Sequence, residues 1–252
     1  MRIDYDKMAE IFDATRTLDP RLVDSVALGI SAIAGEGERV LDIGTGTGRF
    51  LAPLAKLGID ACGLDISKNM LRKARAKGMT NLVQGDATSL PFSDRAFKAS
   101  LVTSVLHLVS GWKGLMLEAS RVSERAIIAV DDGRGRENPT EAFMSIMREK
   151  GFTPPRAGPL ESELAKCCAP ECRIGLGEYE ERTTKEKILS NLGMKTYPFQ
   201  FDLTDEENRQ CMEEFGRRYA EEITIHRTVT LIVWNPAKLR ERIPGITFDY
   251  PH

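Results

Sequence analysis

The sequence has no strong excess of charge of either sign and no long apolar segment. Its 252 residues include 35 Lys and Arg and 37 Asp and Glu, which gives a net charge of −2. This balance gives no electrostatic basis for a polyanionic partner, so we expect no nucleic-acid substrate. No run approaches the ~20 apolar residues that a membrane span needs, and residues 1–6 are charged where a secretory signal would be apolar. We therefore expect a cytoplasmic protein.

Cysteine and histidine are also scarce, with five and three residues respectively. Only Cys167, Cys168 and Cys172 lie close together, no second pair stands at zinc-site spacing, and the histidines are scattered. Half-buried thiols at a helix end are the simpler interpretation of this cluster, although a metal or redox role stays open. We predict no metal site.

The chain is organised around a glycine-rich segment at residues 40–48, Val-Leu-Asp-Ile-Gly-Thr-Gly-Thr-Gly. An apolar run of β type breaks into Gly44, Gly46 and Gly48, and residues 49–57 continue with helical spacing of their apolar side chains. A strand, a tight glycine turn and a helix form the opening unit of a nucleotide-binding α/β sheet. Glycine allows backbone dihedrals that other residues avoid and lets a ligand lie against the main chain.

Strands and helices alternate through the first half of the chain. The apolar patterns predict strands at 39–43, 58–65, 81–85, 97–102 and 126–130, with helices between them. This alternation is typical of a doubly wound, Rossmann-like α/β sheet that is mostly parallel and carries helices on both faces. A later strand at 228–234 is apolar on both faces, so we expect it in the interior of the sheet.

We expect one domain, residues 1–252, made of four parts. These are N-terminal helices at 1–35, a ligand-binding core at 36–132, a helical cap with one strand at 133–222, and the last strand and tail at 223–252. The cap is predicted from charged helical patterns at 185–192 and 206–222, because solvated charge is typical of a cover over one end of a sheet. The strand of the cap is predicted at 173–179.

Three details indicate which nucleotide-like ligand the glycine turn binds. The position where a dinucleotide fingerprint has its last glycine is not glycine. Asp42 stands just before the turn, where its charge would oppose a pyrophosphate and favour a sulfonium with an amino-acid tail. Asp42, Asp65 and Asp86 lie at or just after the carboxyl ends of successive predicted strands, and ligands bind at this edge of a parallel sheet. The three carboxylates would therefore converge on a ligand rich in hydroxyl and amino groups, which disfavours a nicotinamide-dependent dehydrogenase.

Residues 40–48, 63–71 (Gly-Leu-Asp-Ile-Ser-Lys-Asn-Met-Leu) and 85–92 (Gly-Asp-Ala-Thr-Ser-Leu-Pro-Phe) resemble the successive motifs of class I S-adenosylmethionine-dependent methyltransferases. The nearest branch is the small-molecule one that includes the ubiquinone and menaquinone biosynthesis methyltransferases, which residues 97–108 and 5–9 also resemble. The resemblance covers about the first half of the chain in the right order. It implies that the strand at 228–234 is the antiparallel last strand of that fold.

This resemblance implies an enzyme that transfers a methyl group from S-adenosyl-L-methionine to a small-molecule acceptor by in-line displacement. The cofactor-binding residues that it implies are Tyr5, Asp42, Gly44, Thr45, Gly46, Gly48, Asp65, Ile66, Met70, Asp86, Ala87 and Thr103. Asp42 and the glycine turn would hold the methionine end of the cofactor. Asp65 would bind the ribose hydroxyls.

The adenine end of the cofactor would meet four further residues of this set. Ile66 and Met70 would sandwich the ring, and Asp86 with the Ala87 amide would hydrogen-bond the edge that carries its amino group. Tyr5, with Arg16 on the same N-terminal segment, would close over the cofactor, unless this segment merely packs as a capping helix.

A general base is needed only if the acceptor must lose a proton, because the methyl donor arrives already activated. His107 is the candidate base, since it is the histidine placed at the carboxyl edge of the sheet. The alternative is a histidine at a helix start that bonds the backbone. His226 is interpreted as structural.

Acceptor-binding residues are less clear in the sequence. Tyr179, Tyr197 and Phe199 would line an apolar pocket, or form the core of the cap. Arg134 and Arg136 would meet an anionic acceptor, or lie in a solvated loop. The sequence determines neither the acceptor nor the oligomeric state.

A second class of function stays open. The same fold would serve an S-adenosylmethionine-binding protein without methyltransferase activity, either a sensor or an inactive partner. No residue excludes this alternative, because the chemistry has no obligatory catalytic side chain.

Overall fold

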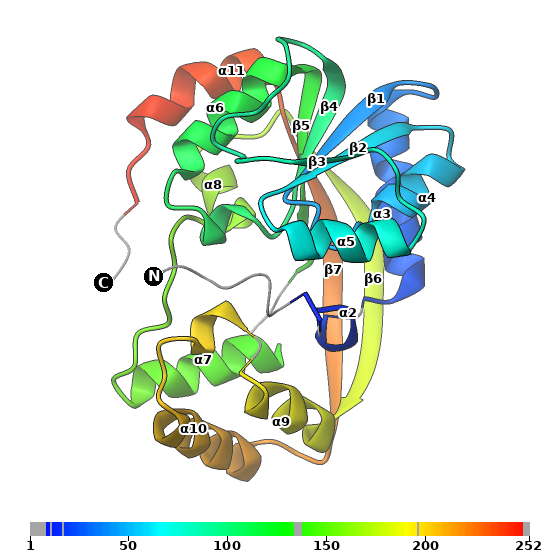
Figure 1. Ribbon diagram of the computed structural model, residues 1–252. Helices are drawn as coiled ribbons and strands as arrows, with labels where there is room; N and C mark the ends of the chain where they lie inside the picture. Colours follow the sequence, from blue (N-terminus) through cyan, green and yellow to red (C-terminus); the bar gives the residue numbers. More distant parts are fainter. Residues whose placement is uncertain (1–8, 11, 17, 134–137, 196, 249–252) are drawn as a thin grey trace.

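The computed structural model describes residues 9–10, 12–16, 18–133, 138–195 and 197–248. Seven strands form one sheet in the order β3-β2-β1-β4-β5-β7-β6 (Figure 1). The strands are β1 (Arg39–Ile43), β2 (Asp60–Asp65), β3 (Leu82–Gln84), β4 (Phe97–Val102), β5 (Ser123–Asp131), β6 (Cys172–Thr184) and β7 (Glu222–Trp234). The first five pair in parallel, whereas β7 is antiparallel to both of its neighbours, β5 and β6. The predicted mostly parallel sheet with an antiparallel last strand is confirmed.

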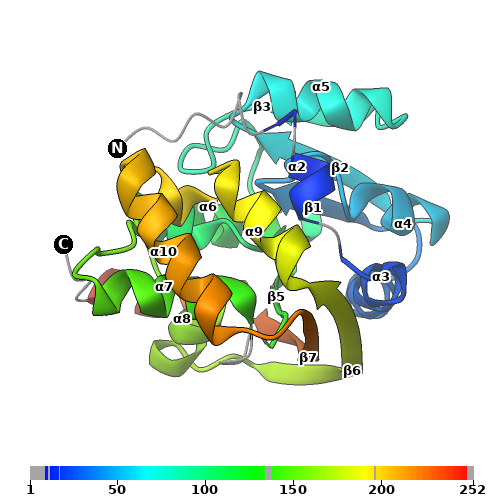
Figure 2. The ribbon, with the colours of Figure 1, turned by 90° about the horizontal axis from the view of Figure 1, so that it is seen from below.

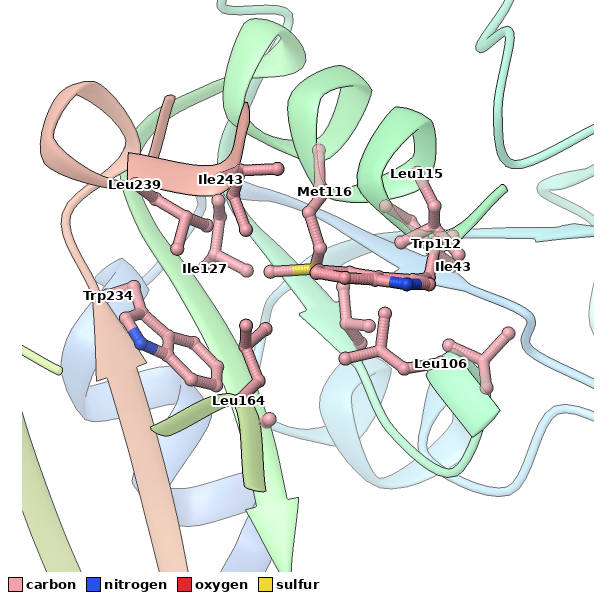
Figure 3. Close-up of a cluster of buried hydrophobic side chains, with 14 of the residues drawn as sticks. Ile43, Leu106, Trp112, Leu115, Met116, Ile127, Leu164, Trp234, Leu239 and Ile243 are labelled. Atoms are coloured by element: carbon pink, nitrogen blue, oxygen red, sulfur yellow. The ribbon is translucent and has the colours of Figure 1, made fainter. Parts of the chain in front are cut away.

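Helices cover both faces of the sheet. On one face α3 (Pro20–Ala34) and α4 (Leu51–Lys56) enclose an apolar cluster, and α5 (Lys68–Ala76) lies beside β2 and β3. The other face is covered by α6 (Trp112–Val122), α8 (Glu161–Cys167) and α11 (Pro236–Arg242). The core on this second face contains Trp112, Met116, Leu164, Trp234 and Ile243 (Figure 3). Among the described helices, none is both long and apolar enough to cross a membrane.

A group of short helices faces the carboxyl ends of the parallel strands. They are α7 (Pro139–Glu149), α9 (Lys185–Gly193), η2 (Pro198–Gln200) and α10 (Asp205–Arg218). These helices pack around their own apolar cluster, which includes Phe143, Leu192, Phe215 and Ile225. The distal parts of β6 and β7 run past the end of β5 as a two-stranded ribbon to reach them (Figures 1 and 2). We call this group the cap.

The predicted bounds of three elements in the second half are wrong. The strands predicted at 173–179 and 228–234 are both longer, because each continues along the other after the sheet ends. The helix predicted at 206–222 ends at Arg218, and the chain enters β7 at Glu222. The predicted interior position of the later strand is confirmed, since β7 lies between β5 and β6.

Candidate functional site

The glycine turn lies at the carboxyl end of β1. Gly44, Gly46 and Gly48 have φ values of +74°, +56° and +80°, in the left-handed region that favours glycine. The amides of Gly44 and Thr45 both donate to the carbonyl oxygen of Leu64, at 2.8 and 3.0 Å, which fixes the turn against β2. A Cβ on Gly44 would lie 2.7 Å from Val105 Cγ2. Glycine is therefore required here by both backbone conformation and space.

Asp42 is buried within β1, with 4% of its surface exposed. Thr45 Oγ1 donates a 2.7 Å hydrogen bond to its Oδ2 atom. Burial raises the pKa of Asp42 to about 6, and the nearby charge of Asp65 adds to the increase, whereas the Thr45 hydrogen bond opposes it. A carboxylate in this state is stabilised by any cation that binds beside it.

Asp65 connects the end of β2 to the glycine turn. Its Oδ2 atom accepts from the Gly46 amide and its Oδ1 atom from the Ser67 amide, both at 2.8 Å. The side chain is half-buried. Because each carboxylate oxygen can accept more than one hydrogen bond, Asp65 keeps the capacity to accept from ligand hydroxyls.

The residues predicted to hold the adenine differ in exposure. Ile66 is 59% exposed, whereas Met70 is 3% exposed and packs with Ala9 in a small cluster that Phe12 and Phe201 border. Asp86 is exposed, and its Oδ1 atom accepts from both the amide and the hydroxyl of Thr88 at 2.8 Å, while Ala87 is half-buried. Ile66 thus offers an open apolar surface, and Met70 is covered by segments far apart in the sequence.

The chain turns sharply after β4. Thr103 Oγ1 is buried and finds no hydrogen-bond partner within the described part of the chain. The next residue, Ser104, has a φ of +55°, an uncommon conformation for a residue with a Cβ. His107 follows, half-buried on η1 (Leu106–Leu108). A buried hydroxyl without a partner next to strained backbone is typical of a ligand site.

Helix α2 (Phe12–Thr15), on the N-terminal segment, contacts the glycine turn. Asp13 accepts from Thr47 Oγ1 at 2.6 Å and is paired with Lys77 Nζ at 2.7 Å. A Cβ on Gly46 would lie 3.9 Å from the Phe12 ring. The predicted contact of Tyr5 lies outside the described residues.

Arg16 joins this N-terminal segment to the cap. Its guanidinium lies 4.8 Å from the centre of the Phe12 ring and 4.9 Å from that of Tyr197. Tyr197 in turn stacks on Phe199 at 5.2 Å, and Phe199 packs on Phe143 at 6.0 Å. Tyr197 and Phe199 therefore pack within the cap.

The remaining predicted residues that the structure describes lie on elements other than the glycine turn. Tyr179 packs on the core beneath α3, and His226 is exposed on β7 opposite Glu180. Cys167 and Cys172 are exposed and Cys168 is buried, and no metal-binding group of His, Cys, Asp or Glu occurs among the described residues. Arg134 and Arg136 lie outside the described residues.

Glu161, which no sequence motif marks, also reaches this region. It is the first residue of α8, is 6% exposed, and accepts from the Val105 amide at 3.2 Å through Oε1. The sequence contains no signal for this contact, because it joins segments 56 residues apart through the topology of the sheet.

Comparison with known proteins identifies the segment that forms most of this site. Residues 41–126 match the family model of the methyltransferase domain. The demethylmenaquinone methyltransferase of Tropheryma whipplei (strain Twist) is 35% identical over 131 residues, 47% of this chain and 52% of that protein. The one from Renibacterium salmoninarum is 38% identical over 121 residues, 48% of this chain and 49% of that protein. The chain thus spans about half the length of the curated relatives it matches.

Solved structures share the fold over most of the chain. A Bacillus halodurans C-125 protein, provisionally described as a methyltransferase, has a TM-score of 0.54 at 19% identity over 83% of this chain and 96% of its own. YcgJ of Bacillus subtilis gives 0.51 at 18% identity over 84% and 98%. The [4+2]-cyclase SpnF gives 0.50 at 15% identity over 86% and 84%. These likenesses establish the fold, and the match of residues 41–126 confirms the resemblance to class I methyltransferases.

Proposed function

We propose that this chain is an S-adenosylmethionine-dependent methyltransferase that acts on a small-molecule acceptor. The observation that carries the proposal is the position of Asp42, Asp65 and the glycine turn side by side at the ends of β1 and β2, inside a methyltransferase domain. When bound, the cofactor would supply a methyl group that its sulfonium charge has already activated.

The described residues fit this cofactor. The buried carboxylate of Asp42 suits the cationic methionine end, and Asp65 suits the ribose hydroxyls. The exposed side chain of Ile66 suits an adenine face, and the Thr103 hydroxyl has hydrogen-bonding capacity for a ligand. A dinucleotide fits less well, because the Asp42 charge would oppose a pyrophosphate.

The main tasks of the protein in such a reaction are to orient the acceptor and to exclude water. The cap faces the carboxyl edge of the sheet, which suits both tasks (Figure 2). His107 lies in the segment that follows β4 at this edge and is our candidate base for an acceptor that must lose a proton.

The acceptor itself is proposed only as a small molecule. Relatives named demethylmenaquinone methyltransferases make demethylmenaquinone the first compound to test. The cap, however, lies outside residues 41–126, which match the methyltransferase domain, so its acceptor contacts do not follow from that match.

The alternative is a protein that binds the cofactor without transferring its methyl group. SpnF shares this fold and carries the name of a cyclase, so the fold alone is compatible with other chemistry. Transfer of labelled methyl groups to demethylmenaquinone, or to a metabolite extract, separates the two functions.

Calorimetry with S-adenosylhomocysteine tests the cofactor assignment. We expect wild type to bind and Asp65→Ala to bind at least about ten-fold more weakly, because hydrogen bonds to a charged group are lost. Asp60→Ala is the matched control, since Asp60 begins the same strand at its opposite end and is exposed. Equal affinities of the wild type and Asp65→Ala would refute the assignment.

A further inference from the structure

A segment outside the matched domain braces the turn that follows β4. We call residues 103–108 the β4 turn and residues 156–163 the brace. The brace touches the turn through a 2.9 Å hydrogen bond from the Ala157 amide to the His107 carbonyl and through the close approach of Gly158 to the Leu106 carbonyl. A Cβ on Gly158 would overlap that carbonyl oxygen, so the two backbones are in direct contact.

Glu161 adds a side-chain contact to these backbone contacts. Its Oε1 atom accepts from the Val105 amide at 3.2 Å, in a buried setting. Val105 follows Ser104, whose φ of +55° turns the chain out of the β4 ladder. A buried amide at such a point needs a partner from elsewhere in the chain, and Glu161 supplies it.

Val105 transmits this contact to the glycine turn. Its side chain is 8% exposed and lies against Gly44, so that a Cβ there would be 2.7 Å from Val105 Cγ2. A displacement of Val105 would therefore change its contact with Gly44 and shift the start of the glycine turn. The same β4 turn carries Thr103 and His107.

The brace is itself firmly held. Leu164 on α8 and Leu106 in the β4 turn belong to the same buried cluster (Figure 3). Arg156 donates to the Gly158 carbonyl at 2.8 Å and pairs with Glu163, which fixes the loop before α8. The segment that carries Glu161 is thus held in place by contacts of its own.

We propose that Glu161 is a positioning residue for the cofactor and methyl-transfer site, acting through Val105. This inference rests on the proposed function. This role requires a side-chain oxygen that accepts from the Val105 amide and a side chain as long as that of glutamate. Glutamine keeps that oxygen and that reach without the charge, whereas aspartate keeps the charge and falls short by one methylene group.

The test compares Glu161→Gln and Glu161→Asp by calorimetry with S-adenosylhomocysteine. We expect Glu161→Gln to bind within about two-fold of wild type and Glu161→Asp about ten-fold more weakly, which corresponds to one lost buried hydrogen bond. Glu171→Asp is the matched control, because Glu171 is exposed between α8 and β6. It should bind as wild type does.

A spectroscopic signal reports on the turn independently of the ligand. The chain has three histidines, so the His107 resonances can be resolved by NMR of histidine-labelled protein. Glu161→Asp should shift them, and Glu171→Asp should not. Wild-type affinity in a folded Glu161→Asp variant, or a ten-fold loss in Glu161→Gln, would overturn the inference. If wild type itself fails to bind, the proposed function fails, and the His107 signal still decides whether Glu161 holds the turn.

Discussion

Thr45 in the glycine turn donates a 2.7 Å hydrogen bond to the carboxylate of Asp42, and both side chains are buried. Although this bond favours the ionised carboxylate, burial outweighs it and raises the pKa of Asp42 to about 6, with the charge of Asp65 adding to the increase. The free site therefore contains a carboxylate whose charge is only partly compensated, so both ligand binding and folding should depend on its protonation.

Binding of S-adenosylhomocysteine should weaken as the pH falls through about 6. A bound ammonium group favours the ionised form of Asp42 and lowers its pKa, so binding near pH 6 releases protons. Below that pH the affinity should fall by up to about ten-fold per pH unit. Calorimetry between pH 5 and 8, in buffers of different ionisation enthalpy, measures both effects. Constant affinity from pH 5 to 7 would contradict this role of Asp42.

Asp42→Asn should stabilise the ligand-free protein above pH 6 while weakening ligand binding. The folded-state pKa of Asp42, about 6, exceeds the ordinary value of 3.8, so the folded protein loses stability as the pH rises through this range. Asparagine removes the buried charge and still accepts from Thr45, for a gain of at most about 3 kcal/mol. Urea unfolding of both proteins at pH 5 and 8 should show the difference growing with pH.

Gly44→Ala should be far more disruptive than Gly37→Ala. Both glycines have a φ of +74°, but a Cβ on Gly37 meets no atom within 4 Å, whereas one on Gly44 meets Val105 at 2.7 Å. The left-handed backbone alone costs an alanine about 1–2 kcal/mol. Gly44→Ala should cost more than this in urea unfolding and should abolish ligand binding, whereas Gly37→Ala should bind normally. Equal costs would show that Val105 yields without penalty.

Arg121 should control the order of the loop after β3. It donates to the carbonyls of Phe92 at 2.8 Å and Leu90 at 3.1 Å, and its partner Glu118 accepts from the Leu90 amide at 2.8 Å. Arg121→Gln should lower the local stability of this loop by about 1–2 kcal/mol, since the side chain is partly exposed. Hydrogen exchange of residues 88–94 measures the change. Arg125→Gln, at an exposed position on β5, is the control and should leave the exchange unaltered.

The parts of the fold predicted best from the sequence are those buried on both sides. The bounds of β1 and β4 are as predicted, because continuous apolar runs such as Val40 to Ile43, interrupted only by Asp42, mark such strands. The distal halves of β6 and β7 were missed. Exposed and more buried residues alternate along these halves, which pair with each other. The local sequence pattern does not reveal that pairing.

The residues of the candidate site also fall into those that the sequence predicts and those that it does not. Asp42, Asp65 and the glycines lie on consecutive strand ends, so spacing and topology together bring them to one edge. Glu161 and Asp13 come from segments with no motif, and their contacts with Val105 and Thr47 depend on how α8 and α2 pack. Side-chain contacts between distant elements follow from the packed structure, which the local sequence does not specify.

Helix α2 should limit how fast the ligand leaves. Asp13 holds it to the glycine turn through Thr47 at 2.6 Å and to the end of α5 through Lys77, the residue after that helix, at 2.7 Å. Asp13→Ala removes both contacts and should raise the dissociation rate of S-adenosylhomocysteine several-fold, with the effect reduced at high salt because part of the attraction is ionic. Surface plasmon resonance measures the rate.

Glu10→Gln is the informative control for this helix. Glu10 pairs with Arg72 at 3.1 Å and with Lys73 at 2.7 Å, both on α5, but these pairs are exposed to solvent and contribute little to holding the two segments together. If α2 acts through its contact with the glycine turn, Glu10→Gln should release the ligand at nearly the wild-type rate. If both variants release it equally fast, charge on the N-terminal segment, rather than the Asp13–Thr47 hydrogen bond, holds α2 over the site.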